Sequence, residues 1–227
     1  MESDGRLLVT GQRKRIGQGR DCTRDFTAVI SPRETGERPV LRLLVAQIGG
    51  RRFAAPPAGA TDLPKLSLAQ TAERYRTLLE AGTQIGVVPQ LELWGFSKNL
   101  GRLSECVAVA METGHRNACV LADVFHLYKG SSDFHGMRLL GPEAIQVLHL
   151  NDYPSDPPRE KIDDSYRVYP GDGVAPLPGL LQVLRRTGGQ KVLSLELFNR
   201  RYWSEDALEV AKTGLARMKA VVAKTAM

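Results

Sequence analysis

The 227-residue sequence has no apolar stretch near the roughly 20 residues that a membrane-spanning helix needs. Cysteine is scarce as well. Cys22, Cys106 and Cys119 are odd in number and never spaced as CxxC, which argues against a disulfide framework or a zinc–thiolate site. Residues 1–4 lack the basic and then apolar order of a signal peptide. We therefore expect a cytoplasmic protein that makes no contact with a membrane.

The positive charge is concentrated near the N-terminus. The whole chain carries a formal net charge of +6; residues 1–52 hold 11 Lys/Arg against 6 Asp/Glu, whereas the remaining 175 residues hold 20 against 19. The basic run Arg13-Lys14-Arg15 is able to bind phosphate, but a solvated, poorly ordered arm is the more common explanation of such a run. Because the body of the chain is nearly neutral, we expect no nucleic-acid partner.

Beyond residue 40, short apolar segments alternate with helix-like ones. Ser67 offers an N-cap for a helix that ends near Gly82. Residues 41–48 are expected to form the end of a helix, which Gly49-Gly50 would terminate. Strands are expected at 24–30, 52–55, 90–94, 119–124, 145–150 and 191–197, and further helices at 99–114, 174–186 and 204–223. Such alternation predicts βα units and a parallel sheet.

Four of the expected strands end on a side chain that metal ions bind: Glu92, Asp123, His149 and Glu196. Ligands gather at the carboxyl ends of parallel strands. A single strand-end carboxylate is better explained as a cap of the next helix. Four together favour a cation, because converging carboxylates otherwise repel one another. Three carboxylates and one imidazole suit one divalent ion such as Mn, Mg, Co or Zn.

Two more polar residues follow these strand ends. His126 comes three residues after Asp123, so the side chains of both are able to face the same end of the sheet, one as a metal ligand and the other as a substrate contact. Asp152 comes three residues after His149, where it either caps a helix or supports His149 through a hydrogen bond.

From about residue 49 to the C-terminus, these motifs resemble the xylose isomerase-like TIM-barrel superfamily of sugar-phosphate isomerases and epimerases. They are LELWG, DVFH, HLND, the R-x-x-PGDG run at 167–173 and LELFN, in the order of that family. The resemblance implies that one divalent metal is bound by Glu92, Asp123, His149 and Glu196. It also implies that the two glutamates transfer protons.

The same resemblance implies substrate contacts at His126 and at an arginine ahead of the PGDG loop, which falls on Arg167. Trp94 of LELWG is a third substrate-binding candidate. Arg159 is a weaker candidate for the arginine, because the loop at 153–166 is long, and a surface salt bridge is the alternative explanation of Arg167. In this family chemistry, removal of a proton next to a carbonyl gives an enediolate that a cation stabilises.

The expected number of strands is too small for a closed barrel. A (β/α)8 barrel has eight βα units in about 250 residues, and we count five from residue 52 onward. Three more crossovers of roughly 30 residues each do not fit into residues 1–48. We therefore predict a TIM (β/α)8-type barrel that is incomplete at its N-terminal end. Residues 1–40 would be a basic, atypical segment and 41–227 the barrel domain, and the exposed sheet would favour self-association into a homo-oligomer.

The predicted function is a divalent-metal-dependent isomerase or epimerase of a sugar, sugar phosphate or related polyol. One alternative is a dehydratase or lyase that acts on a cyclic polyol with the same groups. Another is a barrel fragment that binds metal or a partner without turnover. A metal-dependent abasic-site endonuclease has the same fold, but the nearly neutral body argues against it.

Overall fold

The computed structural model describes residues 7–10, 28–29, 44–48, 51–55 and 65–225, with burial and side-chain contacts from residue 65 onward. The basic run at 13–15 and most of the predicted N-terminal segment lie outside these ranges, so the division near residue 40 stays a prediction. Within the ranges, no helix combines the length and the apolar character needed to cross a membrane.

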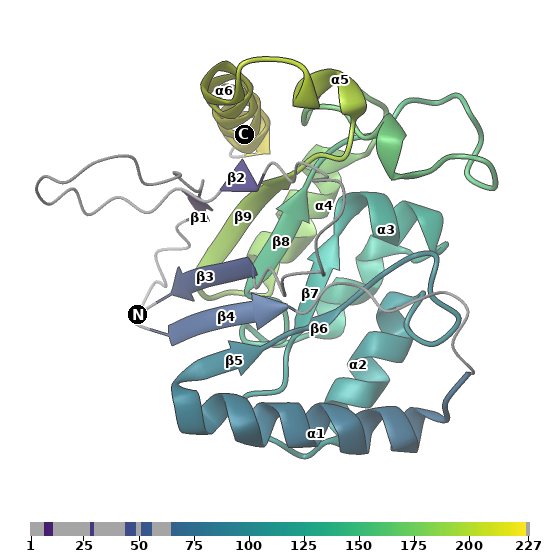
Figure 1. Ribbon diagram of the computed structural model, residues 1–227, viewed down its shortest axis with the longest axis vertical. Coiled ribbons are helices and arrows are strands. Elements are labelled where there is room, and N and C mark those ends of the chain that lie inside the picture. The colour runs from purple at the N-terminus through teal and green to yellow at the C-terminus, as the bar shows by residue number, and fades with distance from the viewer. Residues whose placement is uncertain (1–6, 11–27, 30–43, 49–50, 56–64, 226–227) are drawn as a thin grey trace, which may run out of the picture.

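Parallel strands form the centre of the fold (Figure 1). In chain order they are β4 (Arg51–Ala55), β5 (Val87–Pro89), β6 (Leu91–Glu92), β7 (Val120–Asp123), β8 (Val147–Leu150) and β9 (Lys191–Glu196). Only Gln90 separates β5 from β6, so these two continue one strand. Each strand pairs in parallel with the next along the chain. The five predicted βα strands and the parallel sheet are thus confirmed.

The described N-terminal strands do not add complete βα units. Strands β1 (Leu7–Thr10) and β2 (Ala28–Val29) both pair with β9, at successive stretches of the same edge. Across the ranges given above, no helix precedes residue 68. This arrangement agrees with a TIM-type barrel that is incomplete at its N-terminal end. Self-association of such a barrel stays a prediction.

The expectation of a helix end at 41–48 is wrong for the part that the structure describes. Strand β3 (Leu44–Ile48) pairs antiparallel with β4, with Ile48 opposite Arg51. The two residues between them in the sequence are Gly49-Gly50. A glycine pair is typical both of helix ends and of two-residue hairpin connections, and here it joins two strands.

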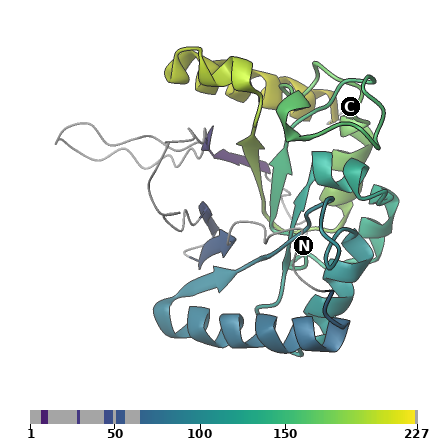
Figure 2. The same cartoon turned by 45° about the vertical axis from the view of Figure 1, so that its right-hand side comes forward.

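The helices lie on the outer side of the strands in both views (Figures 1 and 2). They are α1 (Leu68–Ile85), α2 (Leu103–Glu112), α3 (Val124–Lys129), α4 (Leu177–Arg186), α5 (Arg200–Trp203) and α6 (Ala207–Thr225). Two short 3-10 helices, η1 (Phe134–Leu139) and η2 (Asp164–Tyr166), lie in the loops before β8 and α4. The helices predicted at 174–186 and 204–223 are confirmed, with starts three residues later than expected.

The boundaries of α1 and α2 show how local contacts shift a predicted end. Ser67 caps α1 as predicted, in a reciprocal capping box with Gln70. Gly82 lies inside the helix, where a Cβ atom would collide with Pro89, and the helix ends instead at Gly86, whose φ is 68°. Helix α2 begins four residues later than predicted, because the Ser97 hydroxyl accepts hydrogen bonds from the backbone of Asn99 and Leu100 in a turn.

Two hydrophobic clusters cover the two faces of the sheet. The larger one contains residues of α1, α2, α4 and α6 together with alternate strand residues such as Leu148 and Leu193. The smaller one consists of the intervening strand residues Val88, Leu121, Val147 and Val192 and of Cys119, which directly precedes β7. Successive side chains on a strand point to opposite faces. The smaller cluster therefore marks the inner face of the barrel.

A buried lysine at the start of β9 provides a test of this packing. The Lys191 ammonium donates hydrogen bonds of 2.7 Å to the backbone oxygens of Pro142 and Ile145, and the residue is 2% exposed. Burial lowers the pKa of Lys191 to about 8, below the value of about 10.4 that lysine has in an unfolded chain. Between these two values the unfolded chain binds the extra proton.

We therefore expect Lys191 to make the protein more stable as the pH rises from 8 toward 10. Relative to Lys191→Met, which has no titrating group there, the wild type should gain about 2 kcal/mol of unfolding free energy between pH 7 and pH 10. Urea denaturation of both proteins across this range measures the difference. A difference that stays constant with pH would show that Lys191 is not held in a desolvated environment.

Candidate metal and active site

The four predicted ligands lie on one face of the sheet. Glu92, Asp123, His149 and Glu196 each stand an even number of residues from a member of the smaller, inner cluster, so their side chains also point inward. Strand pairing sets Asp123 directly beside His149. Each residue is also at or near the carboxyl end of its strand. The two-residue repeat of side-chain direction and the pairing register of the strands therefore bring the four side chains together at this end of the sheet.

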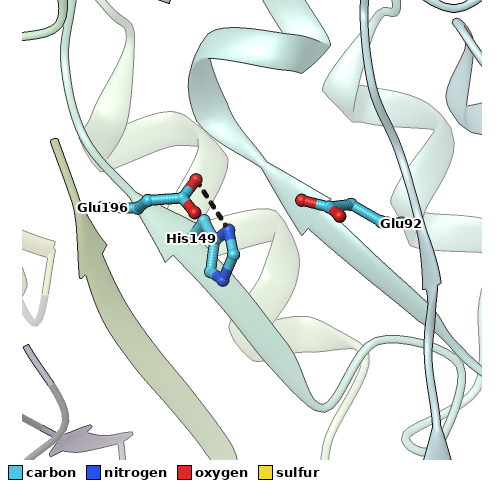
Figure 3. Close-up of side chains that lie close together, drawn as sticks. All are labelled: Glu92, His149 and Glu196. Carbon is cyan, nitrogen blue, oxygen red and sulfur yellow. Dashed lines mark ion pairs between the residues drawn. The ribbon is translucent and has the colours of Figure 1, made fainter. Parts of the chain in front are cut away.

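The close-up shows the carboxylates of Glu92 and Glu196 facing one another with His149 between them (Figure 3). Potential ligand atoms of these three residues lie within 4.8 Å of one another. The Nδ1 atom of His149 lies 3.0 Å from Glu196 Oε2 and 3.6 Å from Asp123 Oδ2, yet its orientation makes no hydrogen bond with a described residue. A metal ion at this nitrogen would take the place of its proton and lie beside the same two carboxylates.

Asp123 caps a helix with one carboxylate oxygen and presents the other to the site. Its Oδ1 atom accepts a hydrogen bond of 2.9 Å from the backbone N–H of His126 and so caps α3. Its Oδ2 atom faces the site, where the Asn151 amide donates to it at 3.1 Å. The helix cap, which is the common explanation of a single strand-end carboxylate, is thus present at Asp123, and the other oxygen lies on the side of His149.

Arg167 is completely buried, so a surface salt bridge is the wrong explanation of this residue. Its Nη1 atom donates hydrogen bonds of 2.9 Å to Asp123 Oδ2 and 2.8 Å to Glu196 Oε2. On its other side, Nε and Nη2 donate to Asp164 Oδ1 at 2.9 and 2.5 Å. Arg167 thus bridges two of the predicted metal ligands. Arg159, by contrast, is exposed, with its guanidinium 5.8 Å from the centre of the Tyr128 ring.

His126 presents an unpaired donor at the edge of the site. Its Nε2 atom lies 2.9 Å from Arg167 Nη2, and a guanidinium is able only to donate, so Nε2 accepts and Nδ1 carries the proton. Burial lowers the pKa of His126 to about 4, and the ring is therefore neutral at pH 7. Among the described residues, Nδ1 has no hydrogen-bond partner. A buried N–H donor of this kind suits a substrate oxygen.

Aromatic rings surround His126. The predicted substrate residue Trp94 lies edge-on to it, with ring centres 6.4 Å apart, and Phe96 lies at 5.8 Å. The guanidinium of Arg167 lies 4.9 Å from the ring centre of Phe125 and 5.0 Å from that of Phe198. The sequence analysis did not predict Phe96, Phe125 or Phe198 as part of the site, because the paths of the segments that follow the strands decide which aromatic rings meet.

The site contains more negative than positive groups. Burial, together with the charges of Glu196 and Asp123, raises the pKa of Glu92 to about 8. Although burial opposes it, the negative charge of Glu196 and Asp123 raises the pKa of His149 to about 10. The positive charges of Arg167 and His149 outweigh burial at Asp123 and hold its pKa well below its usual range. The charge of His149 also outweighs burial at Glu196 and lowers the pKa of that carboxyl. A further cation would therefore be stabilised here.

The donor set fits a divalent ion. It offers carboxylate oxygens and one imidazole nitrogen, which Mn, Zn and similar ions accept. Two ligand atoms that are each about 2.1 Å from an ion and at right angles lie about 3 Å apart, close to the separation of His149 Nδ1 from Glu196 Oε2. Glu92 and Asp123 would complete the set.

Asp152 organises the PGDG loop, a role that the sequence did not predict. Its Oδ1 atom accepts hydrogen bonds of 2.8 Å from the backbone N–H groups of Tyr153 and Ala175, and Oδ2 accepts one of 3.0 Å from Gly171. Gly173 packs so closely that a Cβ atom there would collide with the Asp152 carboxylate. These contacts fix the segment that follows Arg167. The predicted alternatives, a helix cap or a partner of His149, are not what the described contacts show.

Comparison with known sequences identifies the chain as a xylose isomerase-like TIM barrel. The chain belongs to that family, whose sequence model matches residues 43–221. Among curated proteins, the inosose isomerase of Bacillus velezensis is 28% identical over 155 residues, which is 68% of this chain and 55% of that protein. The chain spans about half the length of the curated relatives it matches.

Solved structures share the fold. One is a crystal structure of the IOLI protein with a binding zinc atom, with a TM-score of 0.67 and 23% identity over 76% of this chain and 63% of that one. Another is an L-ribulose 3-epimerase, with a TM-score of 0.61 and 20% identity over 78% of this chain and 63% of that one. The predicted family and barrel fold are therefore confirmed.

Two substitutions at Asp152 test whether its hydrogen bonds hold the PGDG loop in place. Asp152→Ala removes three hydrogen bonds to a charged acceptor and should lower the unfolding free energy by roughly 3 kcal/mol or more. Asp152→Asn keeps one oxygen and should lose roughly half as much. Urea unfolding of the two variants measures both values. Equal losses in Ala and Asn, or none in either, would contradict the assignment of Asp152 as the anchor of this loop.

Proposed function

We propose that the protein is a divalent-metal-dependent isomerase or epimerase of a sugar or related polyol. The observation that carries the proposal is the placement of Glu92, Asp123, His149 and Glu196 on the inner face at the ends of successive strands. The carboxylates of the two glutamates face each other there. Proton transfer between neighbouring carbons, or between the two faces of one carbon, needs such a pair of acid–base groups.

The four strand-end side chains would hold one divalent ion, in agreement with the zinc atom of the IOLI crystal structure. When bound, such an ion would stabilise the negative charge that develops on the substrate oxygens after proton removal. The metal could be Zn, Mn, Mg or Co, since these ions share oxygen and imidazole ligands.

The protein side chains would perform the proton transfers. Glu92 and Glu196 face each other from β6 and β9, so that, with a substrate between them, one would remove a proton while the other returned it. His126 would donate its Nδ1 proton in a hydrogen bond to a substrate oxygen, and Arg167 would hold a second oxygen. Trp94 and Phe96 would cover the apolar face of the substrate ring or chain.

The names of the relatives support the substrate class. An inosose is a cyclic polyhydroxy ketone and L-ribulose is an open-chain ketose, so both offer a carbonyl next to a hydroxyl-bearing carbon. This chain would act on a compound with that same arrangement of oxygens. A dehydratase on a cyclic polyol would begin with the same proton removal and differ by the loss of water.

We expect His149→Ala to reduce metal binding. The substitution removes the buried imidazole nitrogen from the site, so zinc affinity should fall by roughly tenfold or more. Metal analysis after dialysis and competition with a chromogenic chelator measure the change. His135→Ala is the matched control, because His135 lies in η1, is exposed and pairs with Asp133 instead of a proposed ligand. Unchanged zinc affinity in His149→Ala would remove this residue from the ligand set.

The activity is tested by exchange of the substrate's carbon-bound proton with heavy water. Glu92→Gln and Glu196→Gln should each slow deuterium incorporation by about 10²–10⁴-fold, because general acid–base catalysis is commonly of that size. Glu112→Gln, at the exposed end of α2, should exchange at the wild-type rate. Nuclear magnetic resonance with a panel of ketoses and inososes detects the exchange.

The outcome separates the alternatives. Exchange with formation of an isomer or epimer supports the proposal, and exchange followed by loss of water supports the dehydratase. A wild-type protein that binds metal but exchanges no proton from any compound of the panel would be the inert barrel fragment. In that case the proposed activity would be wrong.

A further inference from the structure

Arg167 contacts the same carboxylate oxygens that the proposed metal needs. Its Nη1 atom donates to Asp123 Oδ2 and Glu196 Oε2, at 2.9 and 2.8 Å. These are also the two oxygens nearest to His149 Nδ1. The guanidinium and the ion would therefore share their closest negative neighbours.

The protein holds this guanidinium from its outer side as well. Asp164 accepts hydrogen bonds from Nε and Nη2. The rings of Phe125 and Phe198 lie about 5 Å from the guanidinium carbon. Arg167 is 0% exposed, so its charge is screened little by water or salt. It is a fixed positive charge beside the metal ligands.

We propose that Arg167 competes with the divalent ion for Asp123 and Glu196 and thereby sets the metal affinity of the site. The inference rests on the proposed function only for the existence of the metal. Two positive charges a few ångströms apart in a buried site repel each other strongly. Binding of the ion therefore weakens the contacts of Nη1, while Asp164 keeps its hold on the opposite side of the guanidinium.

The competition links metal loading to substrate binding. Once Nη1 has given up Asp123 and Glu196, it is a charged donor without its former acceptors, on a guanidinium whose Nη2 atom lies 2.9 Å from His126 Nε2. A hydroxyl, carbonyl or phosphate oxygen of the substrate would accept from it. Arg167 would then bind substrate more tightly in the metal-loaded protein than in the metal-free protein.

We expect that loss of this buried arginine strengthens metal binding instead of weakening it. Arg167→Gln removes the competing charge, so the variant should bind Zn²⁺ about tenfold or more tightly than wild type at pH 8, although it removes a buried residue of the active site. Arg167→Lys keeps a positive charge and should change the affinity by less than about threefold. Arg159→Gln removes an exposed charge outside the site and should leave the affinity unchanged. Isothermal titration with Zn²⁺ and chelator competition measure all four proteins.

The reverse result would overturn the proposal. Equal or weaker zinc binding in Arg167→Gln would mean that the arginine supports the ionised ligands without competing with the metal. If Arg167→Gln unfolds in chelator, zinc should restore its circular dichroism and raise its melting temperature more than it does for wild type. A smaller zinc effect would again overturn the competition.

The two proposals fail in different ways. A wild type that binds no divalent ion would refute the metal-dependent function and the competition together. A wild type that binds zinc, with an Arg167→Gln variant that binds it no more tightly, would refute the competition alone. Proton exchange by the zinc-loaded wild type is measured separately and does not depend on this comparison.

Discussion

A buried cluster of opposite charges constrains the structure of this protein. Strand pairing brings Glu92, Asp123 and Glu196 to one mouth, and ionised carboxylates are costly to remove from water unless positive charge accompanies them. Arg167 and His149 supply that charge within hydrogen-bonding or ion-pair distance. The raised pKa of Glu92 shows that the balance is incomplete. A proton on Glu92 or an added cation would complete it.

The long connection between β8 and α4 positions Arg167 beside these carboxylates. It contains little regular secondary structure, and polar contacts hold it in place. Asp152 fixes the backbone on one side of Arg167, and Asp164 binds the guanidinium directly. Both aspartates and the arginine lie within one loop of the sequence. The geometry of the site therefore depends on hydrogen bonds of this loop as much as on the hydrophobic core.

The sequence predicted those parts of the site that depend on local pattern. The apolar runs before Glu92 and Glu196 mark these residues as strand ends. The cap at Ser67 depends only on the first turn of the helix that it begins. The hairpin at β3 was missed because a glycine pair closes helices and hairpins alike. The roles of Asp152 and Asn151 were also missed, since they depend on the path of a loop that no residue period describes.

The central claim is that the strand-end cluster holds one divalent ion. The most direct test is a crystal structure of the zinc-loaded protein with anomalous data collected on both sides of the zinc absorption edge. The account predicts a single strong peak within about 2.0–2.2 Å of donor atoms of Glu92, His149 and Glu196, with an oxygen of Asp123 alongside. A peak elsewhere, or no peak while Arg167 keeps both of its carboxylate contacts, would contradict it.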